Sequence, residues 1–132
     1  MNQKRKTVGL ALGSGGVKGF AHIGIIEILL ENNIPIDFIA GTSIGAWVGA
    51  NYALFRDLKI LKEMTVGKRK EKLSCLWDIS LNGGLIRGEK VKKLLTEWLG
   101  ENRFEDTGIP FKSVATDIIT GEPYIFNKGS LV

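Results

Sequence analysis

The feature that most restricts the fold is a repeated order of apolar run, glycine-rich turn and helical periodicity. Residues 7–12 form a short, mostly apolar run that ends in a cluster of glycines at 13–16. Apolar residues then recur at helical spacing over 17–32, and a second apolar run, 36–40, precedes another glycine-bounded turn and a helix over 44–55. A strand, a helix and a strand of these lengths form a right-handed parallel crossover. The sequence therefore predicts a three-layer α/β domain with a mainly parallel sheet.

The second half of the chain extends this pattern less regularly. Apolar spacing predicts helices over 58–64 and 89–99, the second ended by a glycine. Residues 111–119 are rich in β-branched and aromatic side chains and predict a strand, with a turn leading into a partner strand over 124–126. Residues 66–81 show no periodicity that assigns them to an element.

Length and composition limit the class of protein. The 132 residues suit one domain, so we expect residues 1–132 to form a single unit. Ser130 would make a good helix N-cap with apolar residues directly behind it, which predicts a domain truncated at its C-terminus. The sequence contains no run of about 18 apolar residues, the length that a transmembrane helix would need. The lone Cys75 cannot form a disulfide within the chain, which favours a cytoplasmic protein, and it excludes a cysteine-rich metal site. We expect neither a metal nor a cofactor.

Charge bears on the partners of the chain. Lys and Arg number 18 against 14 Asp and Glu, a net charge of +4, and no recognisable nucleic-acid-binding module surrounds the basic residues. Nucleic acid is therefore not an expected partner. The basic run at 68–72 has two interpretations, a solvated face or a peripheral contact with an anionic membrane surface.

The second glycine turn, Gly41-Thr42-Ser43-Ile44-Gly45, fits the pattern G-x-S-x-G. In that pattern a serine lies on a tight strand-to-helix turn with its hydroxyl exposed, and the flanking glycines relieve backbone clashes. The helix that follows would direct its N-terminal amides to the same place. A purely structural Gly-Ser-Gly turn is the alternative, and the pattern alone does not separate the two.

The first glycine turn, residues 13–19, reads GSGGVKG and also lies between a strand and a helix. Its free amides would form a cradle for an anion. A dinucleotide-binding fingerprint would need glycine at Lys18 and an acidic residue after the second strand, where Gly41 stands instead. A phosphate-binding loop would need a glycine followed by Lys and Ser or Thr, which this turn lacks. Nucleotide binding is therefore disfavoured.

The sequence predicts that the two glycine turns lie at the same edge of the sheet. Consecutive strands of a parallel sheet end on the same edge, so the crossover brings the amides of Gly15 and Gly16 to the edge where Ser43 is exposed. This arrangement is a nucleophile facing an oxyanion hole.

Three segments carry a resemblance to a known family. GLALGSGGVKGFAHIGIIEIL at 9–29, IDFIAGTSIGA at 36–46 and VATDIITGEP at 114–123 resemble bacterial members of the patatin-like phospholipase family. The resemblance implies a serine lipid acyl hydrolase of the phospholipase A or esterase type, acting on a lipid or acyl-ester substrate. The resemblance implies that Ser43 is the nucleophile. It also implies that the backbone amides of Gly15, Gly16 and Lys18 form the oxyanion hole.

The resemblance also implies a Ser-Asp dyad, whose aspartate stands in a D-G-G or D-G-A motif after the ATD segment. None of the five aspartates is followed by glycine: they are Asp37, Asp57, Asp78, Asp106 and Asp117. We therefore expect the chain to hold half a dyad, to be nearly silent as a catalyst, and to self-associate through an exposed sheet edge. A non-catalytic binding or regulatory module with the same cradle is the alternative.

A histidine-containing triad does not fit the order of the residues. His22 precedes Ser43, which excludes the order serine, acid, histidine. The order histidine, acid, serine would use Asp37, which lies near the opposite end of its strand. We expect His22 to have a packing or hydrogen-bonding role and Asp117 to organise a turn.

Overall fold

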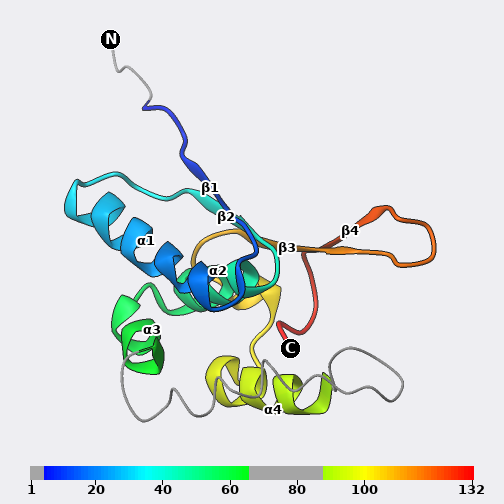
Figure 1. The fold of residues 1–132 in the computed structure, drawn as a ribbon. Helices are drawn as coiled ribbons and strands as arrows, with labels where there is room; N and C mark the ends of the chain where they lie inside the picture. Colours follow the sequence, from blue (N-terminus) through cyan, green and yellow to red (C-terminus); the bar gives the residue numbers. More distant parts are fainter. Residues whose placement is uncertain (1–4, 66–87) are drawn as a thin grey trace.

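The computed structural model describes residues 5–65 and 88–132 (Figure 1). The strands are β1 (Gly9–Leu12), β2 (Phe38–Gly41), β3 (Phe111–Thr116) and β4 (Pro123–Phe126). The α-helices are α1 (Ala21–Glu31), α2 (Ile44–Phe55), α3 (Leu58–Thr65) and α4 (Gly88–Leu99), and the 3₁₀-helices are η1 (Gly16–Phe20) and η3 (Phe104–Asp106). The basic run at 68–72 and Cys75 lie outside the described residues. Within the described ranges, no helix has the length and apolar character needed to cross a bilayer.

The sheet has the order β1-β2-β3-β4, in which the first three strands are parallel and β4 pairs antiparallel with β3. The register aligns Leu12 with Gly41 and Gly41 with Ser113. The carboxyl ends of the three parallel strands therefore share one edge. The predicted α/β class and the mainly parallel sheet are confirmed.

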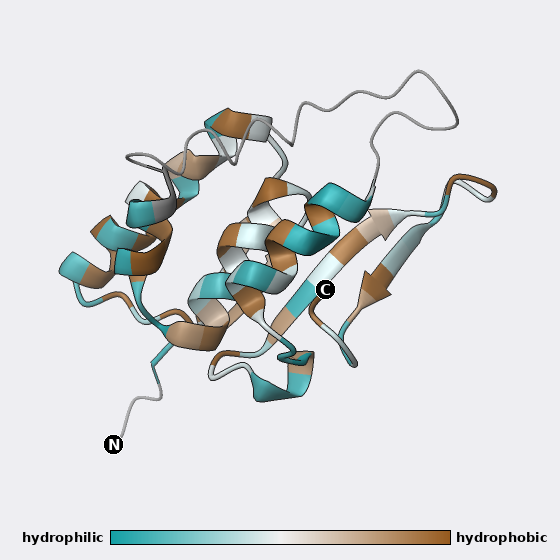
Figure 2. Ribbon diagram, turned by 90° about the horizontal axis from the view of Figure 1, so that it is seen from below, coloured by the Kyte–Doolittle hydropathy of each residue, from teal (hydrophilic) through white to brown (hydrophobic). Residues whose placement is uncertain are grey.

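The helices cover one face of this sheet. In Figure 1 they lie below the strands, and Figure 2, seen from below, shows them in front of the sheet. Leu12 and Ile39 on the covered face are buried, whereas Ala11, Phe38 and Ala40 alternate with them and are exposed. Of the three layers predicted, the described residues thus form two.

Helix α2 is the central element of the covered face. Val48 and Ala53 on this helix are completely buried. A Cβ added to Gly49 would lie 3.0 Å from side-chain carbons of Ile39 and Phe111, so α2 packs closely on β2 and β3. This close packing fixes the N-terminus of α2 at the carboxyl edge of the sheet.

Several element boundaries differ from the sequence prediction by one or two residues, and two larger differences have a local cause. The helix predicted over 17–32 begins as the 3₁₀-helix η1, and α1 starts only at Ala21. Two glycines in η1, Gly16 and Gly19, weaken the α-helical preference, and Gly16 has a positive φ of 53°. The strand predicted over 111–119 ends at Thr116, because the Asp117 carboxylate accepts hydrogen bonds from two later backbone amides and bends the chain.

Candidate active site

Ser43 lies on a sharp turn between the end of β2 and the start of α2. Its backbone has φ 53° and ψ −128°, a conformation that a residue with a side chain adopts only under strain of about 1–3 kcal/mol. The residue is exposed, and its hydroxyl makes no capping hydrogen bond to the helix. A strained turn that presents an unbonded hydroxyl is typical of a nucleophile and is not needed for a merely structural turn.

The flanking glycines are required by the close approach of α2 to the sheet. A Cβ on Gly41 would lie 2.6 Å from the Cα of Ala46. A Cβ on Gly45 would lie 2.5 Å from Gly13 O and would come still closer to Leu12 O. Only glycine fits either place without moving backbone, which explains the spacing of G-x-S-x-G.

Thr42 ties the turn to both neighbouring strands. Its N–H donates to Leu12 O at 3.1 Å, and its Oγ1 donates to Val114 O at 3.0 Å. Ser43 is therefore held between β1 and β3 by hydrogen bonds from the residue before it.

The first glycine turn lies at the same edge of the sheet. Gly16, Val17 and Ser43 line one pocket, so the structure brings the two predicted loops together. Within residues 5–65 and 88–132, the N–H groups of Gly15 and Gly16 have no backbone partner. The N–H of Lys18 donates to Gly15 O at 3.1 Å and is not a free donor.

His22 supports this turn. Its Nε2 lies 2.9 Å from Gly13 O, and because a carbonyl oxygen only accepts, the imidazole donates. The Nε2–H group of the ring is thereby engaged with the backbone of the glycine turn. The hydrogen-bonding role predicted for His22 is confirmed.

The described aspartates have structural roles. At the amino end of β2, the Arg5 guanidinium and the Val8 N–H lower the pKa of Asp37 to about 2. Asp117 accepts from Ile119 N at 2.8 Å and Thr120 N at 3.1 Å, which lowers its pKa and confirms its predicted role in a turn. The other two described aspartates bond to backbone amides near helix starts: Asp57 to Lys59 N at 2.7 Å and Asp106 to Arg103 N at 2.8 Å.

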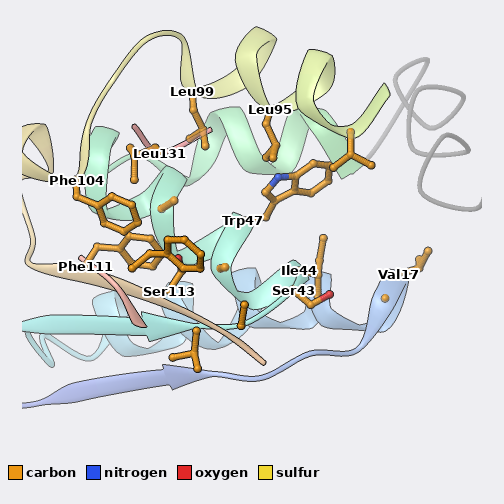
Figure 3. A pocket seen from close by; sticks show the side chains of 17 residues that line it. Val17, Ser43, Ile44, Trp47, Leu95, Leu99, Phe104, Phe111, Ser113 and Leu131 are labelled. Carbon is orange, nitrogen blue, oxygen red and sulfur yellow. The ribbon is translucent and has the colours of Figure 1, made fainter. Parts of the chain in front are cut away.

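Ser43 opens into an apolar pocket of about 500 Å³ (Figure 3). Val91, Leu95 and Leu99 of α4 form one wall beside Trp47 of α2. Figure 3 shows Phe104 and Phe111 at the end away from Val17, and the two rings stack with centroids 5.6 Å apart. No Asp, Glu or His among the described residues lines this pocket, and that part of the chain holds no cluster of three metal-ligating side chains.

The sequence predicted helix α4, which forms one wall of this pocket, but it did not predict the pocket. The periodicity over 89–99 shows an apolar stripe, but not that Val91 and Leu95 face a cavity while Leu94 and Trp98 form a cluster with Phe20, Trp47 and Ile60. Trp47 contributes to both places, since its ring centroid lies 4.6 Å from that of Trp98.

The fold and the site define a class: α/β proteins in which a serine on a strained strand-to-helix turn faces a glycine loop and an apolar pocket. The chain belongs to the patatin-like phospholipase family, which it matches over residues 10–130. This result confirms the resemblance seen in the sequence.

Individual relatives agree with this assignment. An uncharacterized NTE family protein of Mycobacterium tuberculosis is 38% identical over 125 residues, which is 94% of this chain and 34% of the relative. The lysophospholipase NTE1 of Yarrowia lipolytica is 33% identical over 94% of this chain and 9% of its own length. The neuropathy target esterase sws of Drosophila pseudoobscura is 32% identical over 95% of this chain, again 9% of the relative. The chain thus spans about a third of the length of the mycobacterial relative and about a tenth of the others.

Proposed function

We propose that the chain carries the nucleophile and the oxyanion hole of a serine lipid acyl hydrolase of the phospholipase A or esterase type. The observation that carries this proposal is the strained, exposed Ser43 at the mouth of an apolar pocket. Family membership and the names of the lysophospholipase and esterase relatives support it.

In the proposed reaction, Ser43 Oγ attacks the ester carbonyl carbon, and the carbonyl oxygen becomes an oxyanion. We assign its stabilisation to the N–H groups of Gly15 and Gly16, which have no backbone partner among the described residues. Each donor of this kind contributes about 3–4 kcal/mol. The Lys18 amide is not a third donor in this proposal, because its N–H is bonded to Gly15 O. The alcohol leaves with a proton, and water then attacks the acyl-enzyme to release the carboxylic acid and restore the serine.

A general base must take the proton from Ser43 and pass it to the leaving alcohol. Asp37, Asp57, Asp106 and Asp117 are engaged elsewhere, and none lines the pocket. We propose that the base is the dyad aspartate that the resemblance places after the ATD segment. Without it, Ser43 should react about 100- to 10,000-fold more slowly.

The pocket favours an acyl chain as the group that is bound. Its wall of aliphatic and aromatic side chains has no charged member among the described residues. A cavity of about 500 Å³ is within the range of pockets that bind small ligands, so it has room for an acyl chain.

One observation favours the second candidate, a module that binds acyl groups without hydrolysing them. Within the described residues, the pocket contains neither a carboxylate nor an imidazole that could serve as a base. The two candidates differ in whether Ser43 acts as a nucleophile.

The test is covalent labelling with an alkyl fluorophosphonate, followed by intact mass and peptide mapping. We expect slow labelling at Ser43, lost in Ser43→Ala. Ser113→Ala is the matched control, because Ser113 lines the same pocket from the regular strand β3 and should leave labelling unchanged. Reaction at another serine, or none at Ser43 at any reagent concentration, contradicts the hydrolase and favours the binding module.

A further inference from the structure

The hairpin formed by β3 and β4 projects from the body of the molecule beyond the carboxyl edge of the sheet (Figure 1). Its tip carries Ile118 and Ile119, which are 94% and 93% exposed. Figure 2 shows this tip as an apolar segment distant from the helices. Two adjacent isoleucines at nearly full exposure are costly in water and indicate a contact with another phase or molecule.

The tip is held in this shape by its own hydrogen bonds. The Asp117 carboxylate accepts from Ile119 N and Thr120 N, and Gly121 N donates to Asp117 O at 2.8 Å. Gly121 has a φ of 76°, which closes the turn. The two isoleucines are therefore presented by an ordered turn.

Two aromatic side chains on β4, Tyr124 and Phe126, form an apolar track that connects the tip with the candidate active site. Phe126 lines the pocket, and the Tyr124 ring contacts it edge-on with centroids 4.7 Å apart. The register pairs Phe126 with Ser113 and Tyr124 with Ala115, so the four side chains share the pocket side of the hairpin. This track leads from the pocket toward Ile118 and Ile119.

Charge on the hairpin identifies the kind of surface that it fits. Lys112 and Lys128 near its base balance Asp117 and Glu122 near its tip, which gives residues 112–128 no net charge. The tip itself is acidic, so an anionic surface would not attract it. The two isoleucines at the tip form a narrow apolar wedge of the size that an acyl layer accepts.

We propose that the tip of the β3–β4 hairpin inserts Ile118 and Ile119 into the apolar layer of a lipid surface and so places the pocket at the source of its substrate. This inference rests on the proposed function. Because burying one isoleucine raises a partition coefficient by about tenfold or more, the pair contributes about 100-fold. The contact is weak and reversible compared with a lipid anchor.

The experiment measures partition of the chain onto vesicles of neutral phosphatidylcholine. Ile118→Ser/Ile119→Ser should lower the partition coefficient about 10- to 100-fold. The matched control is Ile25→Ser/Ile28→Ser, which removes two isoleucines of 54% and 57% exposure on α1, away from the hairpin, and should change it less than about threefold. Binding by the hairpin should not weaken between about 0.1 M and about 1 M salt, where electrostatic attraction is screened.

A second measurement keeps the test independent of folding in the double variant. Ile119→Cys, carrying an environment-sensitive dye in a Cys75→Ser background, should give a blue-shifted emission on neutral vesicles. Unchanged emission, equal partition of the wild type and the tip variant, or equal losses in the tip and control variants would overturn the inference. So would a tip variant that turns an oligomer into a monomer while vesicle binding stays constant, since the tip would then contact protein.

Failure of the proposed function gives a different result. Vesicle binding requires no turnover, so Ser43→Ala should partition like the wild type. Loss of fluorophosphonate labelling with intact insertion would contradict the hydrolase alone.

Discussion

Replacing Gly45 with alanine tests whether the nucleophile turn depends on close contact between α2 and β1. The added Cβ would lie 2.5 Å from Gly13 O and closer still to Leu12 O. These are backbone atoms of a strand end, so they move only if the strand or the helix moves. Leu12 O also accepts the 3.1 Å hydrogen bond from Thr42 N that holds the turn.

The expected cost follows from these contacts. Overpacking of this kind costs about 1–3 kcal/mol, or more where backbone must shift, and loss of the Thr42 bond adds about 1 kcal/mol. The higher helix propensity of alanine than of glycine offsets about 1 kcal/mol of this loss of stability. We expect Gly45→Ala to lower the free energy of unfolding by about 1–3 kcal/mol.

The assay is denaturant unfolding followed by circular dichroism, with Gly24→Ala as the matched control. Gly24 lies in α1 with open space where its Cβ would be, so this variant should gain up to about 1 kcal/mol. If Gly45→Ala were as stable as Gly24→Ala, the packing of α2 on β1 described above would be wrong.

Three further predictions concern the same edge of the sheet and the strand that leads to it. Ser43→Gly should raise the free energy of unfolding by about 1 kcal/mol and abolish labelling, because glycine adopts φ 53° and ψ −128° without strain; a less stable variant contradicts the strained turn. Asp37, with its pKa lowered to about 2 from 3.8, stabilises the fold fully above about pH 4 and loses this effect as the pH falls toward 2. Asp37→Asn should therefore unfold with a weaker pH dependence across that window, and an unchanged acid transition refutes the linkage. His22→Ala loses the bond to Gly13 O but should keep most of the labelling rate, and a loss as complete as in Ser43→Ala would identify His22 as the base.

Local patterns predicted the elements that carry the site. Glycine clusters between an apolar run and a helical stripe define strand-turn-helix units, and two of them on parallel strands must end at one edge. Spacing and the chirality of the crossover alone predict that Ser43 and Gly16 lie at one edge, and in the structure both residues line the same pocket.

Features that depend on competition between groups were not predictable in the same way. Asp117 ended a strand early because its carboxylate outcompetes the ladder for backbone amides. The Lys18 amide turned inward to Gly15 O because the turn winds as a 3₁₀-helix. The pocket wall forms where α4 packs beside α2. This contact joins segments that are far apart in the sequence, and hydrophobic periodicity does not predict which elements pack together.

The most direct test of the central claim is a crystal structure of the Ser43 adduct with a long-chain alkyl phosphonate. We predict a covalent bond from Ser43 Oγ to phosphorus and a phosphonyl oxygen about 2.7–3.1 Å from the N–H groups of Gly15 and Gly16. The alkyl chain should lie in the pocket between Trp47 and Leu95. An adduct whose oxygen points away from both glycines, with its chain in solvent, would contradict the assignment of this edge as an acyl-ester site.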